Sequence, residues 1–345
     1  MKTSFIMWWK PPSPGTRRVL VLSNQPGFAL PFDEASEREV DEVVAGIAEA
    51  LDKRRVPHER LWLTDSVDPL LEALQRRSFS TVFNICESLG GSPLGEILVA
   101  SALERLGVPY TGCPPAALGL CLDKGLSKCL LRMMGFPVPK FFVVSQWEKI
   151  PAKLPFRMPM IVKPLLQDAS IGIHDTSVVR SKKVMKEQVA AVHQQYHEPA
   201  IVEEFIHGRE FNVSVIGNHK PKALPVSEID FSGLPTGLPK IVTYEAKWNK
   251  NDPRYGGTVP VVPAPIPPEM TRTLQDLAVR SGRALGCRHY WRVDFRVTKN
   301  GEPRIVEVNP NPDLHPEAGL ARALKAAGMT YDGFIVKAIQ WSQES

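Results

Sequence analysis

Two segments near the C-terminal end of the chain have the pattern of a β-hairpin. Residues 292–297 and 304–309 each alternate apolar with polar side chains. The dipeptide Asn300-Gly301 between them is the strongest short signal for a two-residue hairpin turn. Side chains two apart in a strand share one face of the sheet, so the turn decides which polar groups meet.

Four polar residues of this hairpin are expected on one patch. The register places Asp294 opposite Glu307 and Arg292 opposite Asn309. Two carboxylates that face each other across a ladder repel unless a cation lies between them, and oxygen ligands without Cys or His suit Mg²⁺. An exposed hairpin with solvated charges is the weaker reading, because aligned polar groups on apolar arms are costly. The hairpin therefore predicts a Mg²⁺ site.

Composition narrows the classes of protein. A chain of 345 residues with 43% hydrophobic content can bury a large core. Its net charge of +5 includes no dominant basic block, so nucleic acid is not an expected partner. No apolar run reaches the roughly 20 residues that span a bilayer, so no membrane segment is expected. Five cysteines without a C-x-x-C pair are typical of reduced, mostly buried thiols in a cytoplasmic protein.

The first part of the chain alternates strands and helices. Apolar runs at 18–23 and 80–84 predict strands, and helical spacing covers 40–51 and 95–106. This alternation indicates a parallel sheet covered on both faces.

The remainder predicts a mixed α and β arrangement. Helices are expected at 123–134, 183–197, 268–285 and 316–327, strands at 140–144, 160–163, 201–205 and 210–217, and a loop at 165–173.

Five motifs follow one another in an order that is typical of one family. They are Ser36-Glu37-Arg38-Glu39-Val40, Pro109-Tyr110-Thr111-Gly112 with Asp123-Lys124, Lys163-Pro164, Val202-Glu203-Glu204-Phe205 with Gly208 and Glu210, and Tyr244-Glu245-Ala246-Lys247-Trp248. Together with the hairpin, they resemble the ATP-grasp ligases, and among these the D-alanine–D-alanine ligase branch. Each motif alone is a weak signal, whereas five in order are a strong one.

The resemblance implies a three-lobed ATP-grasp fold that combines α/β and α+β lobes. An N-terminal parallel-sheet lobe would cover 18–108, a central lobe 109–208, and a C-terminal lobe with the metal site 209–345. Residues 1–17 would be an extension. ATP would lie between the second and third lobes, and the loops at 165–173 and 244–255 would close over it.

The resemblance also implies ligands for ATP. Lys124 and Lys163 would neutralise the phosphates. For Lys163 an ordinary surface position is the weaker reading, because it ends an apolar run and precedes Pro164; for Lys124 the two readings are equal. The remaining nucleotide contacts would come from Ser170 in the phosphate-covering loop, from Glu203, Glu204, Phe205 and Ile206 along the adenine edge, and from Glu210 at the ribose.

The implied chemistry is ATP-driven amide formation. Two Mg²⁺ ions, with Mn²⁺ as a substitute, would be held by Asp294 and Asn309, with Glu307 bridging both ions. Arg292 would steady the transferred oxygens, and Lys247 would contact phosphate or the bound carboxylate. A substrate carboxylate would attack the γ-phosphate, and an amine would then displace phosphate from the acyl phosphate.

The departures from the family lie on the substrate side. A serine and a tyrosine that form a hydrogen-bonded triad with a glutamate correspond here to Ala169 and Trp248, so only Glu37 of the triad remains. Alanine has no hydroxyl group and indole can only donate, so the triad cannot form. Glu37 could still hold a substrate ammonium group, or it could simply be an acid in the first turn of a helix.

A second departure follows the metal site. Asp313 takes the place of a glycine that faces the reacting carbonyl. A carboxylate there would favour an amine or cationic substrate, or it would cap the helix expected from residue 316.

Three functions remain open at this point. The first is a carboxylate–amine ligase with small-molecule substrates unlike D-alanine on at least one side. The second is a D-alanine–D-alanine ligase with a rebuilt pocket, and the third is a non-catalytic ATP-binding homologue. The intact hairpin set argues against the third. A homodimer is left open.

Overall fold

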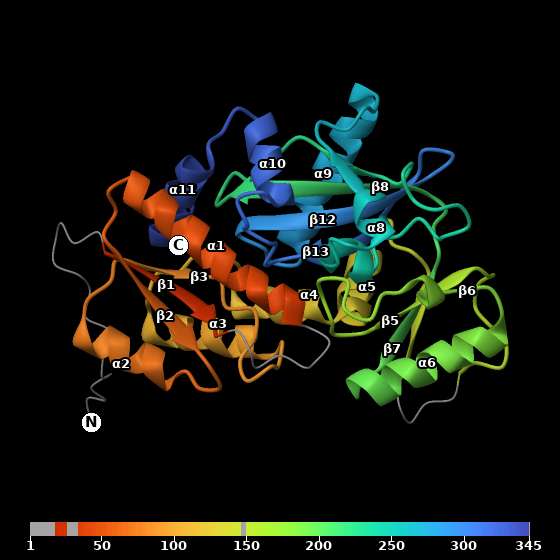
Figure 1. Ribbon diagram of the computed structural model, residues 1–345, viewed down its shortest axis with the longest axis horizontal. Coiled ribbons are helices and arrows are strands. Elements are labelled where there is room, and N and C mark those ends of the chain that lie inside the picture. Colours follow the sequence, from red (N-terminus) through yellow and green to blue (C-terminus); the bar gives the residue numbers. More distant parts are fainter. Residues whose placement is uncertain (1–17, 26–33, 146–149, 345) are drawn as a thin grey trace.

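The computed structural model describes residues 18–25, 34–145 and 150–344, and it describes no side chains for residues 34–38. The strands of these residues form three sheets, each with its own helices (Figure 1). The sheets follow one another along the chain in the order expected of the three lobes, which confirms the fold class. The expected extension at residues 1–17 lies outside the described residues.

The first sheet is parallel, as predicted. Its strand order is β2 (His58–Leu63), β1 (Val19–Asn24), β3 (Thr81–Asn84). Side chains of β1 alternate between two cores. Val19 and Val21 pack with α1 (Glu34–Lys53), and Leu20 and Leu22 pack on the other face with α2 (Asp68–Arg76) and α3 (Gly95–Leu106). Both faces are therefore covered, as a parallel sheet requires.

The last helix of the chain belongs to this first core. Helix α11 (Tyr331–Gln343) contributes Phe334 and Ile335, which pack with α1 and β1, and Figure 1 shows it beside α1. The two ends of the chain therefore share one hydrophobic cluster.

The central sheet is antiparallel, in the order β4 (Phe141–Val144), β7 (Ala200–Glu204), β5 (Met160–Pro164), β6 (Val178–Val179). Helix α6 (Lys182–Tyr196) covers one face. Helices α4 (Pro115–Leu122) and α5 (Lys124–Met133) lead into this lobe. Asp123 starts α5, because its side chain accepts a hydrogen bond from the Leu126 backbone N–H at 2.8 Å.

The third sheet carries the hairpin. Its order is β11 (Val259–Val261), β10 (Ser227–Asp230), β8 (Gly208–Gly217), β12 (His289–Thr298), β13 (Pro303–Asn309), and β9 (Lys222–Ala223) pairs with β8. Helix α9 (Pro268–Ala284) packs on one face. Gly282 of α9 is required there, because an added Cβ would lie 2.1 Å from Nε1 of the buried Trp291. A short 3₁₀ turn (Asp175–Ser177) and helices α7 (Tyr244–Trp248), α8 (Pro253–Gly256) and α10 (Gly319–Ala326) complete the described elements.

The hairpin turn differs from the prediction. Residues 299–301 form a three-residue loop: Thr298 N–H donates to Glu302 O at 2.9 Å, and Gly301 takes a φ of +81°. Phe295 consequently pairs with Ile305, one residue out of the predicted register. A β-bulge at Val306 then restores it, so Asp294 does face Glu307. The predicted two-residue turn is wrong, and the predicted pairing at the site is right.

Other predictions have simpler outcomes. Thirteen of the fourteen expected helices and strands lie within three residues of the observed bounds, and the helix expected at 40–51 starts earlier, at Glu34. The elements that were not expected are β2, α2, α4, β6, β9, β10, α7, α8, β11 and α11. Four of the five cysteines are buried and all five are free thiols, with Cys129 exposed. No helix among the described residues is long and apolar enough to cross a membrane. The exact lobe boundaries stay predictions.

Candidate active site

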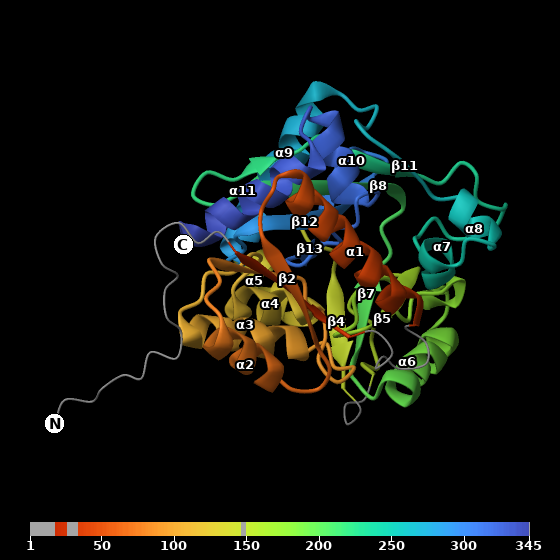
Figure 2. The ribbon, with the colours of Figure 1, turned by 60° about the vertical axis from the view of Figure 1, so that its left-hand side comes forward.

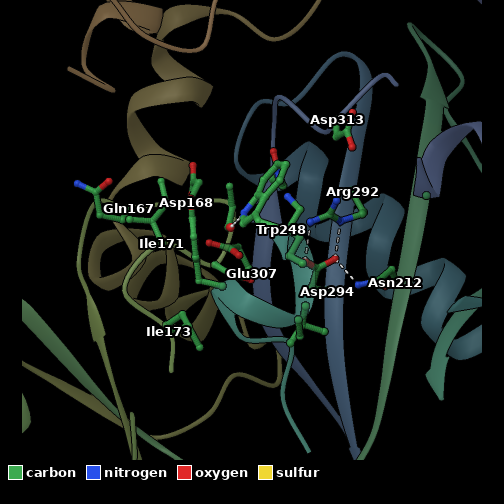
Figure 3. Close-up of a pocket in the computed structure, with 18 of the residues that line it drawn as sticks. Gln167, Asp168, Ile171, Ile173, Asn212, Trp248, Arg292, Asp294, Glu307 and Asp313 are labelled. Atoms are coloured by element: carbon green, nitrogen blue, oxygen red, sulfur yellow. Dashed lines mark hydrogen bonds and ion pairs between the residues drawn. The ribbon is translucent and has the colours of Figure 1, made fainter. Parts of the chain in front are cut away.

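A cavity of about 1430 Å³ opens between the lobes. Its floor is the face of β8, β12 and β13 that α9 does not cover. Its other walls come from the loop after β5, from α7, and from parts of α1 and α3. Figure 3 shows carboxylates, an arginine and an indole from these elements pointing into one space. The cavity therefore gathers residues that are far apart in the sequence.

The hairpin supplies the centre of the floor. Arg292 binds both carboxylate oxygens of Asp294, at 2.8 and 3.0 Å. Asn212, which lies opposite Asp294 on β8, donates to the same carboxylate at 2.7 Å. Glu307 and Asn309 line the cavity from β13. The four polar residues predicted from the hairpin are thus on one face.

Lys124 is buried above this floor. Its ammonium group contacts the Gln167 carbonyl at 2.5 Å, the Asp168 carboxylate at 2.8 Å and the Glu307 carboxylate at 3.1 Å. A lysine has three N–H donors, so these partners match its capacity. The reading of Lys124 as a surface lysine is wrong, because the side chain is only 7% exposed.

A second ion cluster lies beside the first. The Glu203 carboxylate is fully buried and bridges Lys128 at 3.0 Å and Lys163 at 2.9 Å. Lys128 also donates to the Val306 carbonyl, which the bulge of β13 turns toward it. The bulge thus connects the lysines of the central lobe to the hairpin of the third lobe.

The electrostatics follow from this arrangement. Burial alone would raise the pKa of Glu307, but Lys124, Lys128 and Lys163 hold it at about 2. Burial alone would also raise the pKa of Glu203, but Lys128 and Lys163 hold that pKa below its usual range. Both carboxylates are therefore ionised at neutral pH and balance a concentrated positive charge.

The expected adenine edge is only partly free for a ligand. Glu204, Phe205 and Ile206 line the cavity. Glu203 lines it too, but its carboxylate is held between two lysines, since a buried carboxylate needs cations. Glu210, expected at the ribose, also lines the cavity and forms an ion pair with Arg296 at 2.9 Å.

Two loops meet over the cavity. The Trp248 indole donates to the Ala169 backbone carbonyl at 3.0 Å, and Lys247 lies 4.4 Å from the centre of the Trp248 ring. Ala169 and Ser170 both have left-handed φ angles, +54° and +63°. Figure 2 shows α7 next to the central lobe, away from strands β8 and β12 of the third sheet. The two loops are thus joined by an indole N–H and a backbone carbonyl, without a side-chain hydroxyl group in this contact.

Three further contacts hold these loops together. Tyr244 N–H donates to Ile173 O at 2.8 Å, and His174 contacts Glu245 at 2.7 Å. Arg254 of α8 pairs with Asp175. The two loops predicted to act as lids, 165–173 and 244–255, are therefore in contact with each other.

Asp313 does not cap a helix. Its Oδ1 accepts from His315 N–H at 2.7 Å, which is a turn within the loop, whereas α10 starts after Ala318 without a side-chain cap. That alternative is wrong, and Asp313 lines the cavity (Figure 3). Glu37 lies in α1, but its side chain is outside the described residues; Glu39 of the same helix lines the cavity.

Several residues of the site were not assigned from sequence. Lys128 could have been found, because it lies four residues after Lys124 on a predicted helix and so shares its face. Asn212 shares a strand face with Glu210. Arg296 likewise shares a strand face with Arg292 and Asp294. Asp168 gave no such local signal, since its partner Lys124 is distant in the sequence.

The hairpin suits a divalent ion that arrives with phosphate. Asp294, Glu307 and Asn309 offer hard oxygen donors, and Glu307 Oε1 is buried with an ion pair but no hydrogen bond. Among the described residues, no group of three or more His, Cys, Asp or Glu side chains could hold a metal alone. Mg²⁺ is commonly held by one or two carboxylates together with substrate phosphates, and this donor set fits that mode.

Comparisons with known proteins agree with this geometry. Residues 130–340 match the family model described as the D-ala D-ala ligase C-terminus. An uncharacterized protein of Sinorhizobium fredii, y4sG, is 32% identical over 89% of this chain and 90% of its own length. D-alanine–D-alanine ligase B of Chromobacterium violaceum is 30% identical, with 88% and 93% covered.

A solved structure shares the fold. The D-alanine–D-alanine ligase from Bacillus anthracis complexed with ATP superposes with a TM-score of 0.73 at 23% identity, over 95% of this chain and 98% of that one.

Proposed function

Because this chain belongs to the D-alanine–D-alanine ligase family of ATP-dependent C–N ligases, we propose that it joins a carboxylate to an amine through an acyl phosphate, with a substrate other than D-alanine on at least one side. One observation carries the proposal. Lys124 and Lys163 of the central lobe line one cavity together with a hairpin that presents Arg292, Asp294, Glu307 and Asn309. This arrangement suits a polyphosphate with its divalent ion.

The proposed reaction has two steps. An oxygen of the substrate carboxylate attacks the γ-phosphorus of ATP, and the bond from that phosphorus to ADP breaks. The amine nitrogen then attacks the acyl carbon, an amide bond forms, and phosphate leaves while the amine loses a proton to solvent. The protein positions the reactants and balances charge.

Named residues have distinct parts in this scheme. Lys124 and Lys163 neutralise the phosphates, and Arg292 stabilises the oxygens that gain charge during transfer. Asp294, Glu307 and Asn309 would hold one or two divalent ions, which supply charge neutralisation at the phosphates. Lys247 and Trp248 close the cavity from above and exclude water.

The substrate side supports a difference from D-alanine. The Ala169 side chain has no polar atom, and the Trp248 indole already uses its single N–H on the Ala169 backbone carbonyl. Neither side chain can then hydrogen-bond a substrate in the way that a serine and a tyrosine could. Asp313 adds a carboxylate to the same cavity, which favours an amine or cationic group near it.

A D-alanine–D-alanine ligase with a rebuilt pocket is the second candidate. The Trp248–Ala169 contact favours it, because the two loops still join over the cavity without the family's hydroxyl groups. Use of D-alanine alone would distinguish this candidate from the first.

The test is phosphate release from Mg²⁺-ATP with D- and L-amino acids, polyamines and small carboxylates, offered singly and in pairs. We expect release that needs two particular substrates and that falls at least about 100-fold in Asp294→Asn, since the lost charge acts on the transferring phosphate. The matched control is Glu302→Gln, an exposed carboxylate of the same hairpin that binds Arg304.

Each outcome has a clear meaning. Release that requires a pair and disappears only in Asp294→Asn supports the proposal. Strong release with D-alanine alone would establish the second candidate instead. ATP binding without release from any pair would argue against both.

A further inference from the structure

Arg296 of β12 lies at the nucleotide end of the cavity without an assigned role. It lies opposite Glu210 of β8 in the sheet register and on the same face as Arg292 and Asp294. The residue is only 7% exposed. A buried arginine needs partners for its donors, and these partners show what it does.

The guanidinium group joins three other segments of the chain. Nε and Nη2 donate to the Ile206 carbonyl at 3.2 and 3.0 Å, and Nη1 donates to the Lys240 carbonyl at 2.7 Å. Nη1 also donates to Glu210 Oε2 at 2.9 Å. All four hydrogen bonds come from one planar group, so the three groups that accept them are fixed relative to one another.

Aromatic rings complete its surroundings. The guanidinium carbon lies 5.6 Å from the centre of the Phe205 ring and 5.9 Å from that of Phe231. Phe205 and Ile206 belong to the short connection between β7 and β8, which joins the central and third lobes. Gly208 ends this connection, where an added Cβ would collide with the Val297 carbonyl. Arg296 therefore fixes the backbone at the join between two lobes.

The pair with Glu210 connects this backbone to a ligand group. Burial raises the pKa of Glu210, and the charge of Arg296 opposes that rise. A carboxyl group that binds Arg296 through Oε2 can still accept hydrogen bonds from hydroxyl groups through Oε1. A ribose carries two adjacent hydroxyls, which suit a carboxyl group whose position is fixed by an ion pair.

We propose that Arg296 is a positioning residue for the nucleotide: it holds the Glu210 carboxylate and the Ile206 peptide in the arrangement that receives the ribose and base of ATP. The inference rests on the proposed function, because it assumes that ATP occupies this cavity. It assigns to Arg296 the discrimination between ribonucleotide and deoxyribonucleotide. Arg296 itself acts through Glu210 and the backbone rather than on the reacting atoms.

The test measures equilibrium binding by calorimetry, with Mg²⁺ present and no carboxylate substrate, so that turnover is not needed. ATP, 2′-deoxy-ATP and 3′-deoxy-ATP are compared in the wild type, Arg296→Met, Arg296→Lys, Glu210→Gln and the Arg296→Met/Glu210→Gln double variant. Arg304→Met is the matched control, since Arg304 pairs with Arg296 in the register but does not line the cavity.

We expect the wild type to bind ATP about 10- to 100-fold more tightly than at least one deoxy form, as one charged hydrogen bond implies. Arg296→Met and Glu210→Gln should each bring that ratio close to one, and the double variant should be no worse than either. Arg296→Lys should lie between, because a lysine keeps the charge but not the fork.

Other outcomes overturn the inference. If Arg296→Met weakens ATP and its deoxy forms by the same factor, Arg296 is merely structural. If Arg296→Met does not fold, an unchanged ratio in Glu210→Gln would be enough to reject the proposal. Wild-type protein that binds no ATP contradicts the proposed function, whereas ATP binding with a ratio insensitive to Arg296 contradicts only this inference.

Discussion

At the scale of single residues, Lys128 shows how much of the site depends on buried charge. It is fully enclosed and pairs with Glu203, which also binds Lys163. We expect Lys128→Met to lower the free energy of unfolding by about 3 kcal/mol, because a buried carboxylate loses one of its two cations. Urea unfolding measures this loss.

The control and a partial rescue make that result specific. Lys183→Met removes a lysine whose side chain is 87% exposed and should change stability by less than about 0.5 kcal/mol. Lys128→Met/Glu203→Gln should recover part of the loss, since the carboxylate is gone. A single variant as stable as the wild type would mean that the buried pair does not stabilise the fold.

Glu307 predicts a dependence of stability on pH. Its pKa is held at about 2, below the ordinary value of 4.5, so the unfolded chain binds its proton first as pH falls. The stabilisation is present above the ordinary pKa and is lost as pH falls through the folded value, a loss of up to about 3 kcal/mol between roughly pH 5 and pH 2. Urea unfolding across this range should show a shallower fall for Glu307→Gln than for Glu302→Gln. Equal slopes would contradict the assigned pKa.

The residues that sequence could predict share one property: their partners are close in the chain or follow from strand alternation. Asp294, Glu307 and Arg292 lie within one hairpin, so the pattern alone brings them together. Asp168 meets Lys124 only through the folding of the central lobe, and Arg296 meets Ile206 only where the central and third lobes join. No local pattern carries that information.

At the scale of elements, the lids meet through one indole. Trp248 of α7 donates to the Ala169 carbonyl at 3.0 Å. Phenylalanine keeps an aromatic ring but has no donor. We expect Trp248→Phe to increase amide hydrogen exchange in residues 166–173 and 244–248 by about 2- to 10-fold, the worth of one neutral hydrogen bond. Mass spectrometry of exchanged peptides measures this increase.

The matched control for the lid is Trp62→Phe. Trp62 is a partly exposed tryptophan on β2 and does not line the cavity. The Trp62→Phe variant should leave amide hydrogen exchange in both lid segments unchanged. Unchanged exchange in Trp248→Phe as well would mean that the other contacts, such as that of Arg254 with Asp175, are enough to hold the loops.

The elements that sequence missed had weak local signals. Helix α7 has only five residues, too few for a helical period to appear. The hairpin is more instructive, because its three-residue loop and the bulge at Val306 offset each other by one residue. The Asn-Gly signal marked the turn, while the bulge restored the register where Asp294 meets Glu307. Neither the loop length nor the bulge follows from alternation alone.

At the scale of the whole molecule, the site depends on all three lobes. The hairpin belongs to the third lobe, the lysines to the central one, and α1 and α3 add cavity walls from the first. Phe334 and Ile335 of the last helix pack into the core of the first lobe, which ties the third lobe to it. The cavity is therefore a product of lobe packing rather than of any one domain.

This dependence gives a prediction about metal binding. In the described residues Asp294 is already held by Arg292 and Asn212, and Glu307 pairs with Lys124. A divalent ion alone must compete with the charges of Arg292 and Lys124 for these carboxylates. Phosphates, in contrast, can draw Lys124 away and supply further oxygen ligands. We expect Mn²⁺ to bind at least about 10-fold more tightly when a non-hydrolysable ATP analogue is present, a coupling free energy of about 1.4 kcal/mol or more. Electron paramagnetic resonance of free Mn²⁺ measures both affinities.

Mn²⁺ also binds the nucleotide itself, so the control is Asp294→Asn with the same analogue. This variant should lose the part of the gain that the protein supplies. If Mn²⁺ binds the nucleotide-free protein just as tightly, the ion pairs of the hairpin do not oppose the metal.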